Sequence, residues 1–141
     1  MDAALAWARS GIGRTSPNPS VGCVLVKDGK VIGAARTADG GRPHAETQAL
    51  ETAGEAARGA TAYVTLEPCA HTGLTGPCAD ALVEAGISRC VVALVDPDPR
   101  VDGGGLARLA EAGITVEAGL REDEARGVKS EFLSRFAPLR P

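Results

Sequence analysis

A chain of 141 residues with 44% hydrophobic and only 3% aromatic side chains is long enough for one domain with a substantial core. Its net charge of −3 and its scattered basic residues argue against a nucleic-acid binder, which usually carries a basic stripe and stacking aromatics. No long apolar stretch and no basic leader is present, so we expect neither a membrane span nor a signal peptide, and we predict a cytoplasmic protein.

The first half of the sequence predicts two helices that enclose a β-hairpin. Gly11 and Gly13 follow an alanine-rich run and favour the end of a helix there. The pair Asp28-Gly29 separates two β-rich runs, which indicates a hairpin, and Pro43 suits the start of the second helix. In chain order we expect a helix over 3–10, a loop over 14–20, strands over 21–26 and 31–35, and a helix over 44–57.

In the second half, short β-rich runs alternate with helical segments. We expect a strand over 61–66, a helix over 78–85, a strand over 89–95, a helix over 106–112, a strand over 114–117 and a helix over 122–136. Such alternation indicates βαβ crossovers and a largely parallel sheet with helices on both faces, to which the hairpin adds an antiparallel pair. The sequence therefore predicts a single α/β domain over 1–141 with three layers, α/β/α, and a mixed sheet.

Two of the four cysteines lie in the segment LEPCAHTGLTGPC, each directly behind a proline. In a reducing compartment a structural disulfide is uncommon, so Cys69 and Cys78 favour a metal or catalytic role. Cys69 follows a predicted strand and Cys78 begins a predicted helix, whose N-terminal partial charge favours a thiolate. The other two cysteines lie inside apolar strands and are interpreted as small buried side chains: Cys23 and Cys90.

A catalytic zinc site takes three protein ligands and leaves a fourth position to water. His44 begins a predicted helix, and Glu46 follows it in a His-Ala-Glu sequence. Zn²⁺ with one neutral imidazole and the two thiolates of Cys69 and Cys78 sums to about zero charge, which leaves a bound water acidic. Glu46, near the metal but not on it, would take the proton of that water and deliver it to a leaving group. His-x-Glu and Pro-Cys are the parts of the zinc deaminases.

Each of these residues also has a plainer interpretation. Glu46 alone would be a first-turn acid that stabilises a helix. His71 would be the fourth ligand of a non-catalytic zinc module, although it shares a tight loop with Cys69, and we prefer His44 as a ligand because Glu46 accompanies it. Three functions therefore stay open at this point: a pyrimidine deaminase, a deaminase of another base including a tRNA editor, and a zinc module without catalysis.

Five longer segments resemble the deaminase domain of the bifunctional riboflavin biosynthesis deaminase/reductase family, the diaminohydroxyphosphoribosylaminopyrimidine deaminases of the cytidine deaminase-like superfamily. They are GRTSPNPSVGCVLV, GGRPHAE, HAETQAL, TLEPCAHTGLTGPC and VALVDPDPRVDGGGL, and they are distributed over residues 13–106. The gap between Cys69 and Cys78 is typical of this group, whereas related deaminases usually carry Pro-Cys-x-x-Cys. The resemblance implies a mixed five-stranded sheet between helices and hydrolytic deamination of a diaminohydroxypyrimidinone that bears a ribosylamino 5-phosphate.

Carried over by position, the resemblance makes Zn²⁺ the cofactor, held by His44, Cys69 and Cys78, with Glu46 as the proton shuttle. It also implies substrate contacts, and the substrate-binding residues that we expect are Asn18, Asp96, Arg42 and His71. Without the family, Asn18 would be a turn asparagine and Asp96 a turn acid at a strand end.

Two positions depart from the family pattern, because Leu74 and Gly104 stand where a basic residue is usual. Replacement guanidinium groups for a substrate phosphate are available on loops and strand ends: Arg14, Arg36, Arg42 and Arg100. As partners we expect a small-molecule pyrimidine substrate, no nucleic acid and no membrane. We also expect a homo-oligomer, and a reductase domain that is either a separate protein or removed from this chain.

Overall fold

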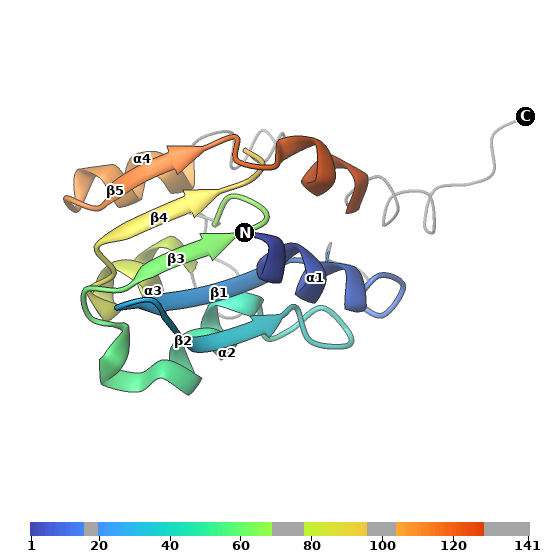
Figure 1. Ribbon diagram of the computed structural model, residues 1–141, viewed down its shortest axis with the longest axis horizontal. Helices are drawn as coiled ribbons and strands as arrows, with labels where there is room; N and C mark the ends of the chain where they lie inside the picture. The colour runs from blue at the N-terminus through green and yellow to red at the C-terminus, as the bar shows by residue number, and fades with distance from the viewer. Residues whose placement is uncertain (16–19, 69–77, 96–103, 129–141) are drawn as a thin grey trace, which may run out of the picture.

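The structure is a computed structural model that describes residues 1–15, 20–68, 78–95 and 104–128 (Figure 1). Its described strands form one mixed five-stranded sheet in the order β2-β1-β3-β4-β5. The strands are β1 (Gly22–Lys27), β2 (Lys30–Arg36), β3 (Thr61–Val64), β4 (Arg89–Val92) and β5 (Thr115–Ala118). The predicted α/β fold with a mixed sheet is confirmed.

The hairpin forms at the predicted Asp-Gly pair. Asp28 and Gly29 both have positive φ angles, 51° and 76°, which is the backbone of the tightest two-residue hairpin turns. Lys27 therefore faces Lys30 across the turn, and β1 and β2 pair antiparallel. Among the described strands, β2 pairs with β1 alone, so it forms an edge of this sheet.

The other half of the sheet consists of parallel crossovers, as the alternation predicted. β3 pairs parallel with β4, and β4 pairs parallel with β5. The connecting helices are α3 (Cys78–Ala85) and α4 (Gly104–Glu111). β3 and β4 end before the predicted strands do. Main-chain hydrogen bonds between the two segments nevertheless continue beyond their C-terminal ends, for example from the Glu67 N–H to the Leu94 carbonyl.

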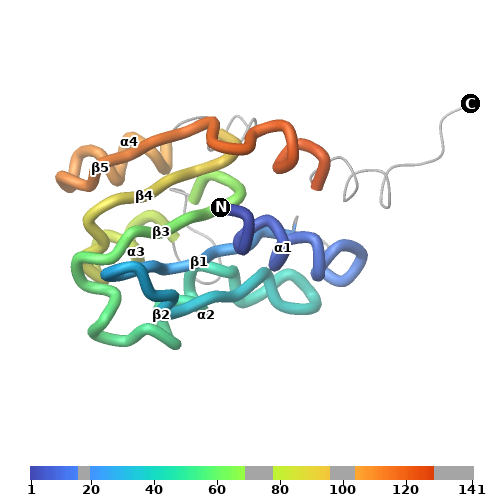
Figure 2. The backbone as a smooth tube through the Cα atoms, in the orientation of Figure 1, coloured from blue at the N-terminus to red at the C-terminus, as the bar shows by residue number. Residues whose placement is uncertain are grey.

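Helices cover both faces of the sheet, which gives the three predicted layers (Figures 1 and 2). One face packs against α2 (Ala45–Ala53), α3 and α4 through a core that includes Leu82 and Leu109. The opposite face packs against α1 (Asp2–Ser10) and the helical residues 122–128, where Leu5 and Ala125 share a second cluster. The remainder of the predicted last helix lies outside the described residues.

The helix predicted over 44–57 is divided in two. α2 ends at Ala53, and the chain continues as the 3-10 turn η1 (Gly54–Ala57). Gly54 has a φ angle of +57°, a left-handed conformation that interrupts an α-helix and that glycine adopts without steric cost.

Two glycines allow α1 and α2 to approach the sheet closely. A Cβ at Gly22 would lie 1.8 Å from the Ala4 carbonyl oxygen of α1, and one at Gly33 would lie 2.4 Å from the Ala49 carbonyl oxygen of α2. The facing helix positions are fully buried alanines, among them Ala4 and Ala49. Small side chains on the sheet and on the facing helices therefore let the two layers pack closely, and they set the distance of α2 from the sheet. Such packing accounts for a core with many alanines and few aromatics.

None of the helices in the described ranges is long and apolar enough to cross a membrane.

Candidate active site

Two of the predicted zinc ligands meet at the starts of two helices. His44 is the N-cap residue of α2, and Cys78 is the first residue of α3. The Nδ1 atom of His44 lies 3.2 Å from the Sγ atom of Cys78 although 34 positions separate them in the sequence. Cys78 is only 3% exposed and His44 is half-buried, so the pair is accessible mainly from the imidazole side.

The spacing of this pair fits a shared zinc ion. Tetrahedral zinc with Zn–S near 2.3 Å and Zn–N near 2.0 Å places its sulfur and nitrogen ligands about 3.5 Å apart. The observed 3.2 Å between Nδ1 and Sγ is close to that separation. The N-terminus of α3 also favours the thiolate form of Cys78, which is the form that binds metal. The chemistry and spacing of these two donors therefore suit zinc.

The third predicted ligand, Cys69, lies outside the described residues. Within the described ranges, no group of three His, Cys, Asp or Glu side chains is placed to hold a metal ion. The structure thus brings together two members of the predicted set.

Glu46 lies in the first turn of α2 and is 5% exposed. Its negative charge interacts electrostatically with two buried thiols of the sheet, those of Cys23 on β1 and Cys90 on β4. Burial is the larger cause and the charge of Glu46 the next, and together they raise the pKa of Cys90 to about 12 and that of Cys23 well above its ordinary value. An acid that only stabilised a helix start would be expected to face solvent, so its burial favours the catalytic interpretation.

Cys23 and Cys90 are fully buried in the core, which confirms their interpretation as small apolar side chains. Because their pKa values are raised, both thiols are protonated at neutral pH. The thiolate is the form that binds metal, so the raised pKa values disfavour both thiols as zinc ligands.

The predicted substrate contacts are divided between described and undescribed parts of the chain. Asn18, His71 and Asp96 lie outside the described residues, as do Leu74 and Arg100. Arg42 is described: it is exposed, two positions before His44, and forms no ion pair within the described part of the chain.

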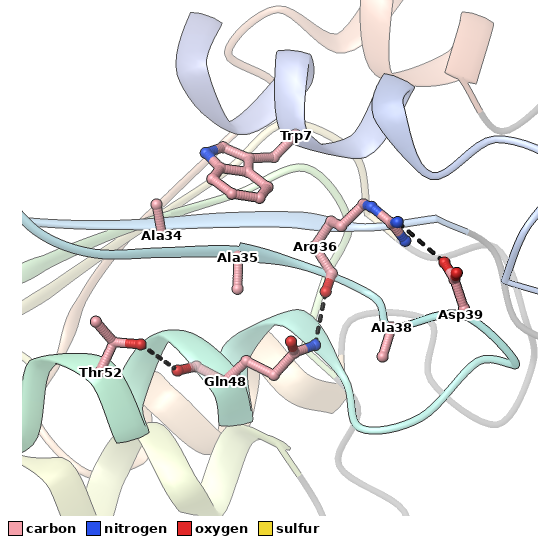
Figure 3. Close-up of a pocket in the computed structure, with 8 residues that line it drawn as sticks. All are labelled: Trp7, Ala34, Ala35, Arg36, Ala38, Asp39, Gln48 and Thr52. Carbon is pink, nitrogen blue, oxygen red and sulfur yellow. Dashed lines mark hydrogen bonds and ion pairs between the residues drawn. The ribbon is translucent and has the colours of Figure 1, made fainter.

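Arg36, another candidate for the phosphate, is already engaged. Its guanidinium pairs with Asp39 at 2.9 Å and donates to the Thr37 carbonyl at 2.8 Å. In Figure 3 its side chain extends from β2 toward α1 and away from α2. Arg14 is exposed, and its main-chain carbonyl accepts a hydrogen bond from the Gly40 N–H.

Glu67 and Gly105 lie beside the segment that leads to Cys69, and they were not predicted as functional residues. The buried Glu67 carboxylate accepts a hydrogen bond from the Leu106 N–H at 3.1 Å, at the start of α4. A Cβ at Gly105 would lie 1.8 Å from the Pro68 carbonyl oxygen. The residues directly before Cys69 are therefore in contact with the start of α4. The available signal in the sequence was an acid between Leu66 and Pro68, two positions before Cys69.

A hollow of about 390 Å³ lies elsewhere, at the free edge of β2 between α1 and α2 (Figure 3). Its lining residues are Trp7, Ala34, Ala35, Arg36, Ala38, Asp39, Gln48 and Thr52. None of the predicted metal or catalytic residues lines it.

The chain resembles known proteins over most of its length. Residues 1–94 match the family described as the cytidine and deoxycytidylate deaminase zinc-binding region. The chain is 53% identical over 136 residues to the riboflavin biosynthesis protein RibD of Escherichia coli (strain K12), covering 96% of this chain and 37% of that protein. It is 44% identical over 136 residues to the diaminohydroxyphosphoribosylamino-pyrimidine deaminase of Buchnera aphidicola subsp. Acyrthosiphon pisum (strain APS), covering 96% and 92%.

A solved structure shows the same fold. The RibD protein of Acinetobacter baumannii superposes with a TM-score of 0.89 at 51% identity, over 96% of this chain and 38% of that one. The chain thus spans well under half the length of the RibD proteins that it matches. The predicted cytidine deaminase-like architecture is confirmed. The chain belongs to the cytidine and deoxycytidylate deaminase zinc-binding family, as its resemblance to the riboflavin-pathway deaminases indicated.

Proposed function

We propose that this chain catalyses the zinc-dependent hydrolytic deamination of an aminopyrimidine, namely the diaminohydroxyphosphoribosylaminopyrimidine intermediate of riboflavin biosynthesis. The observation that carries the proposal is the 3.2 Å approach of His44 Nδ1 to Cys78 Sγ at two helix starts, with the buried Glu46 two residues from His44. The choice of substrate rests on the printed name of a relative that this chain covers over nearly its whole length.

The proposed ligands of the zinc are His44, Cys78 and Cys69. Zinc supplies the Lewis acidity that makes a water molecule acidic near neutral pH. The carboxylate of Glu46 accepts the proton of the attacking water and passes it to the amino nitrogen of the substrate. The water oxygen bonds to the ring carbon, the bond from that carbon to the amino nitrogen breaks, and ammonia leaves. The second proton of the water ends on the adjacent ring nitrogen, so the ring carbon becomes a carbonyl. The reaction consumes one water and needs no redox cofactor.

We propose Asn18, Asp96 and His71 as contacts to the pyrimidine and Arg42 as a contact to the phosphate. Arg42 is supported by its position two residues before His44 and by its exposed guanidinium, which forms no ion pair among the described residues. A guanidinium binds phosphate through two parallel hydrogen bonds. Arg36 is the matched control, because Asp39 and the Thr37 carbonyl already occupy its guanidinium.

The phosphate contact is tested by replacing each arginine. We expect Arg42→Ala to raise KM for the phosphorylated substrate far more than for its dephosphorylated form, while Arg36→Ala raises the two KM values equally or not at all. Equal effects of Arg42→Ala on the two substrates would remove Arg42 from the proposed phosphate site.

The substrate class is tested by measuring ammonia release from four compounds: the riboflavin precursor, cytidine, guanine and tRNA adenosine. We expect release from the precursor alone. Release from cytidine or guanine without release from the precursor would overturn the choice of substrate and leave the zinc chemistry in place.

The other proposals concern the surroundings of the enzyme. We propose that it works on a small molecule without a nucleic-acid or membrane partner, in the cytoplasm, as a homo-oligomer. Two further expectations stay predictions. One is an accompanying reductase domain, and the other is that residues 1–141 form a single domain.

A further inference from the structure

Gln48 lies one helical turn after His44 on α2, and its side-chain amide points back to the loop that precedes His44 (Figure 3). The Nε2 atom lies 2.6 Å from the Arg36 carbonyl oxygen at the end of β2 and 3.0 Å from the Pro43 carbonyl oxygen. A third carbonyl, that of His44, lies at 3.4 Å. Carbonyl oxygens only accept hydrogen bonds, so the donor end of the amide must face them.

From this geometry we propose that Gln48 is a positioning residue for the candidate zinc ligand His44. The inference rests on the proposed function, because it assigns Gln48 a role toward the metal that His44 would bind. Gln48 does not touch the metal or the substrate; it acts through the main chain on which His44 is carried.

Hydrogen bonds of Gln48 connect the end of β2 with the main chain next to His44. Arg36 is the last residue of β2, which its pairing with β1 holds in the sheet. One amide N–H of Gln48 binds the Arg36 carbonyl, and the other binds the carbonyl of Pro43, which is bonded to the nitrogen of His44. The Ala38 N–H donates to that same Pro43 carbonyl at 3.1 Å. The Pro43 carbonyl in the loop before α2 therefore accepts hydrogen bonds from both Gln48 and Ala38.

His44 is the N-cap residue of α2, and its ring nitrogen faces Cys78 Sγ. The main chain at the start of α2 carries this imidazole and therefore helps to set where it lies relative to α3. Metal sites tolerate ligand displacements of only about 0.5 Å, so a loosened first turn would weaken zinc binding.

An alternative role for Gln48 is to bind a ligand in the hollow at the β2 edge, which it lines. Its amide nitrogen, however, is already directed at three carbonyls of the chain itself. The two N–H groups of one amide are fully used by the two shorter contacts. Positioning of the loop is therefore the role that the hydrogen bonds support.

The test compares variants at Gln48 with a control one turn further along α2. Gln48→Met removes both donors at similar length, and Gln48→His returns one N–H donor at a similar reach. Thr52→Val is the control, because Thr52 lines the same hollow and its hydroxyl donates only to the Gln48 carbonyl, at 3.1 Å. Zinc affinity is measured by competition with a chromophoric chelator, and hydrogen exchange of the Ala38 amide is measured in metal-free protein.

We expect Gln48→Met to weaken zinc binding about 10- to 100-fold, the usual effect of removing a group that orients a metal ligand. Exchange of the Ala38 amide should be faster, Gln48→His should recover part of the affinity, and Thr52→Val should match the wild type. Zinc affinity of Gln48→Met equal to that of the wild type would overturn the inference alone. If Gln48→Met does not fold, Gln48→His decides in its place, because histidine keeps only one of the two donors. A zinc affinity below that of Thr52→Val supports the inference, and an affinity equal to that of Thr52→Val overturns it. Wild-type protein that binds no zinc would overturn the proposed function and this inference together.

Discussion

Replacing Gly105 by alanine tests the contact between α4 and the segment that leads to Cys69. A Cβ at this position would lie 1.8 Å from the Pro68 carbonyl oxygen and 3.0 Å from the Pro68 carbonyl carbon. Both are main-chain atoms, so no side-chain rotation relieves the overlap. An ordinary carbon–oxygen contact is about 3.3 Å or longer, and one of the two segments must therefore move by roughly 1.5 Å.

One favourable and two unfavourable effects determine the size of the change in the free energy of unfolding. Alanine is favoured over glycine inside a helix by about 1 kcal/mol, which would stabilise the variant if space were available. Overpacking of this kind costs about 1–3 kcal/mol. The movement also lengthens the 3.1 Å hydrogen bond from the Leu106 N–H to the Glu67 carboxylate, and losing such a bond costs about 1–3 kcal/mol. The free energy of unfolding should therefore fall by about 1–5 kcal/mol.

Thermal and urea denaturation measure this change in metal-free protein. In a domain of this size, each kcal/mol corresponds to about 2–4 °C in Tm, so a fall of several degrees is expected. Gly127→Ala is the control, because a Cβ at Gly127 meets no atom within 4 Å and the residue lies in the helical stretch 122–128. We expect the control to keep or raise Tm. A Gly105→Ala variant as stable as Gly127→Ala would refute the close approach of α4 to Pro68.

Three further predictions concern the site and the buried thiols. Glu46→Gln should fold and keep its zinc yet lose ammonia release by about 10²- to 10⁴-fold, since an amide cannot accept the proton; near-normal turnover would reduce Glu46 to a structural acid. Cys69→Ser should lose or weaken zinc and lower Tm, and full zinc content by elemental analysis would exclude Cys69 as a ligand. Burial raises the pKa of Cys90 from 9.0 to about 12, so the folded state keeps a proton that the unfolded state releases. The free energy of unfolding should therefore fall as pH rises from 9 toward 12, and Cys90→Ala should flatten that decline.

The fold could be predicted from the sequence wherever local chemistry and element length agree. Asp28-Gly29 has one common use between two strands, and the structure places it at the hairpin turn. Cys78 was predicted to begin a helix and does so. The break at Gly54 was missed because the segment over 44–57 keeps helix-favouring alanines on both sides of the glycine, although a glycine with positive φ is a common helix C-cap.

The candidate site was predicted through residue types rather than through contacts. His44, Glu46 and Cys78 were proposed because zinc deaminases use a His-x-Glu sequence and a Pro-Cys sequence, and the structure brings His44 and Cys78 together. Gln48 and Gly105 could not be found in this way. The roles of Gln48 and Gly105 depend on distances to carbonyl oxygens, of Arg36 and Pro43 for the first and of Pro68 for the second. Such distances are set by the tertiary fold and produce no recognisable pattern of residue spacing in the sequence.

X-ray absorption at the zinc edge of the purified chain tests the central claim most directly, because it identifies the atoms bound to the metal. The proposed ligands predict two sulfur atoms at about 2.3 Å, one imidazole nitrogen at about 2.0–2.1 Å, and one light atom from water. A second imidazole in place of the water would show that His71 completes a closed structural site and would contradict a catalytic role. A single sulfur ligand would contradict the pairing of Cys78 with Cys69.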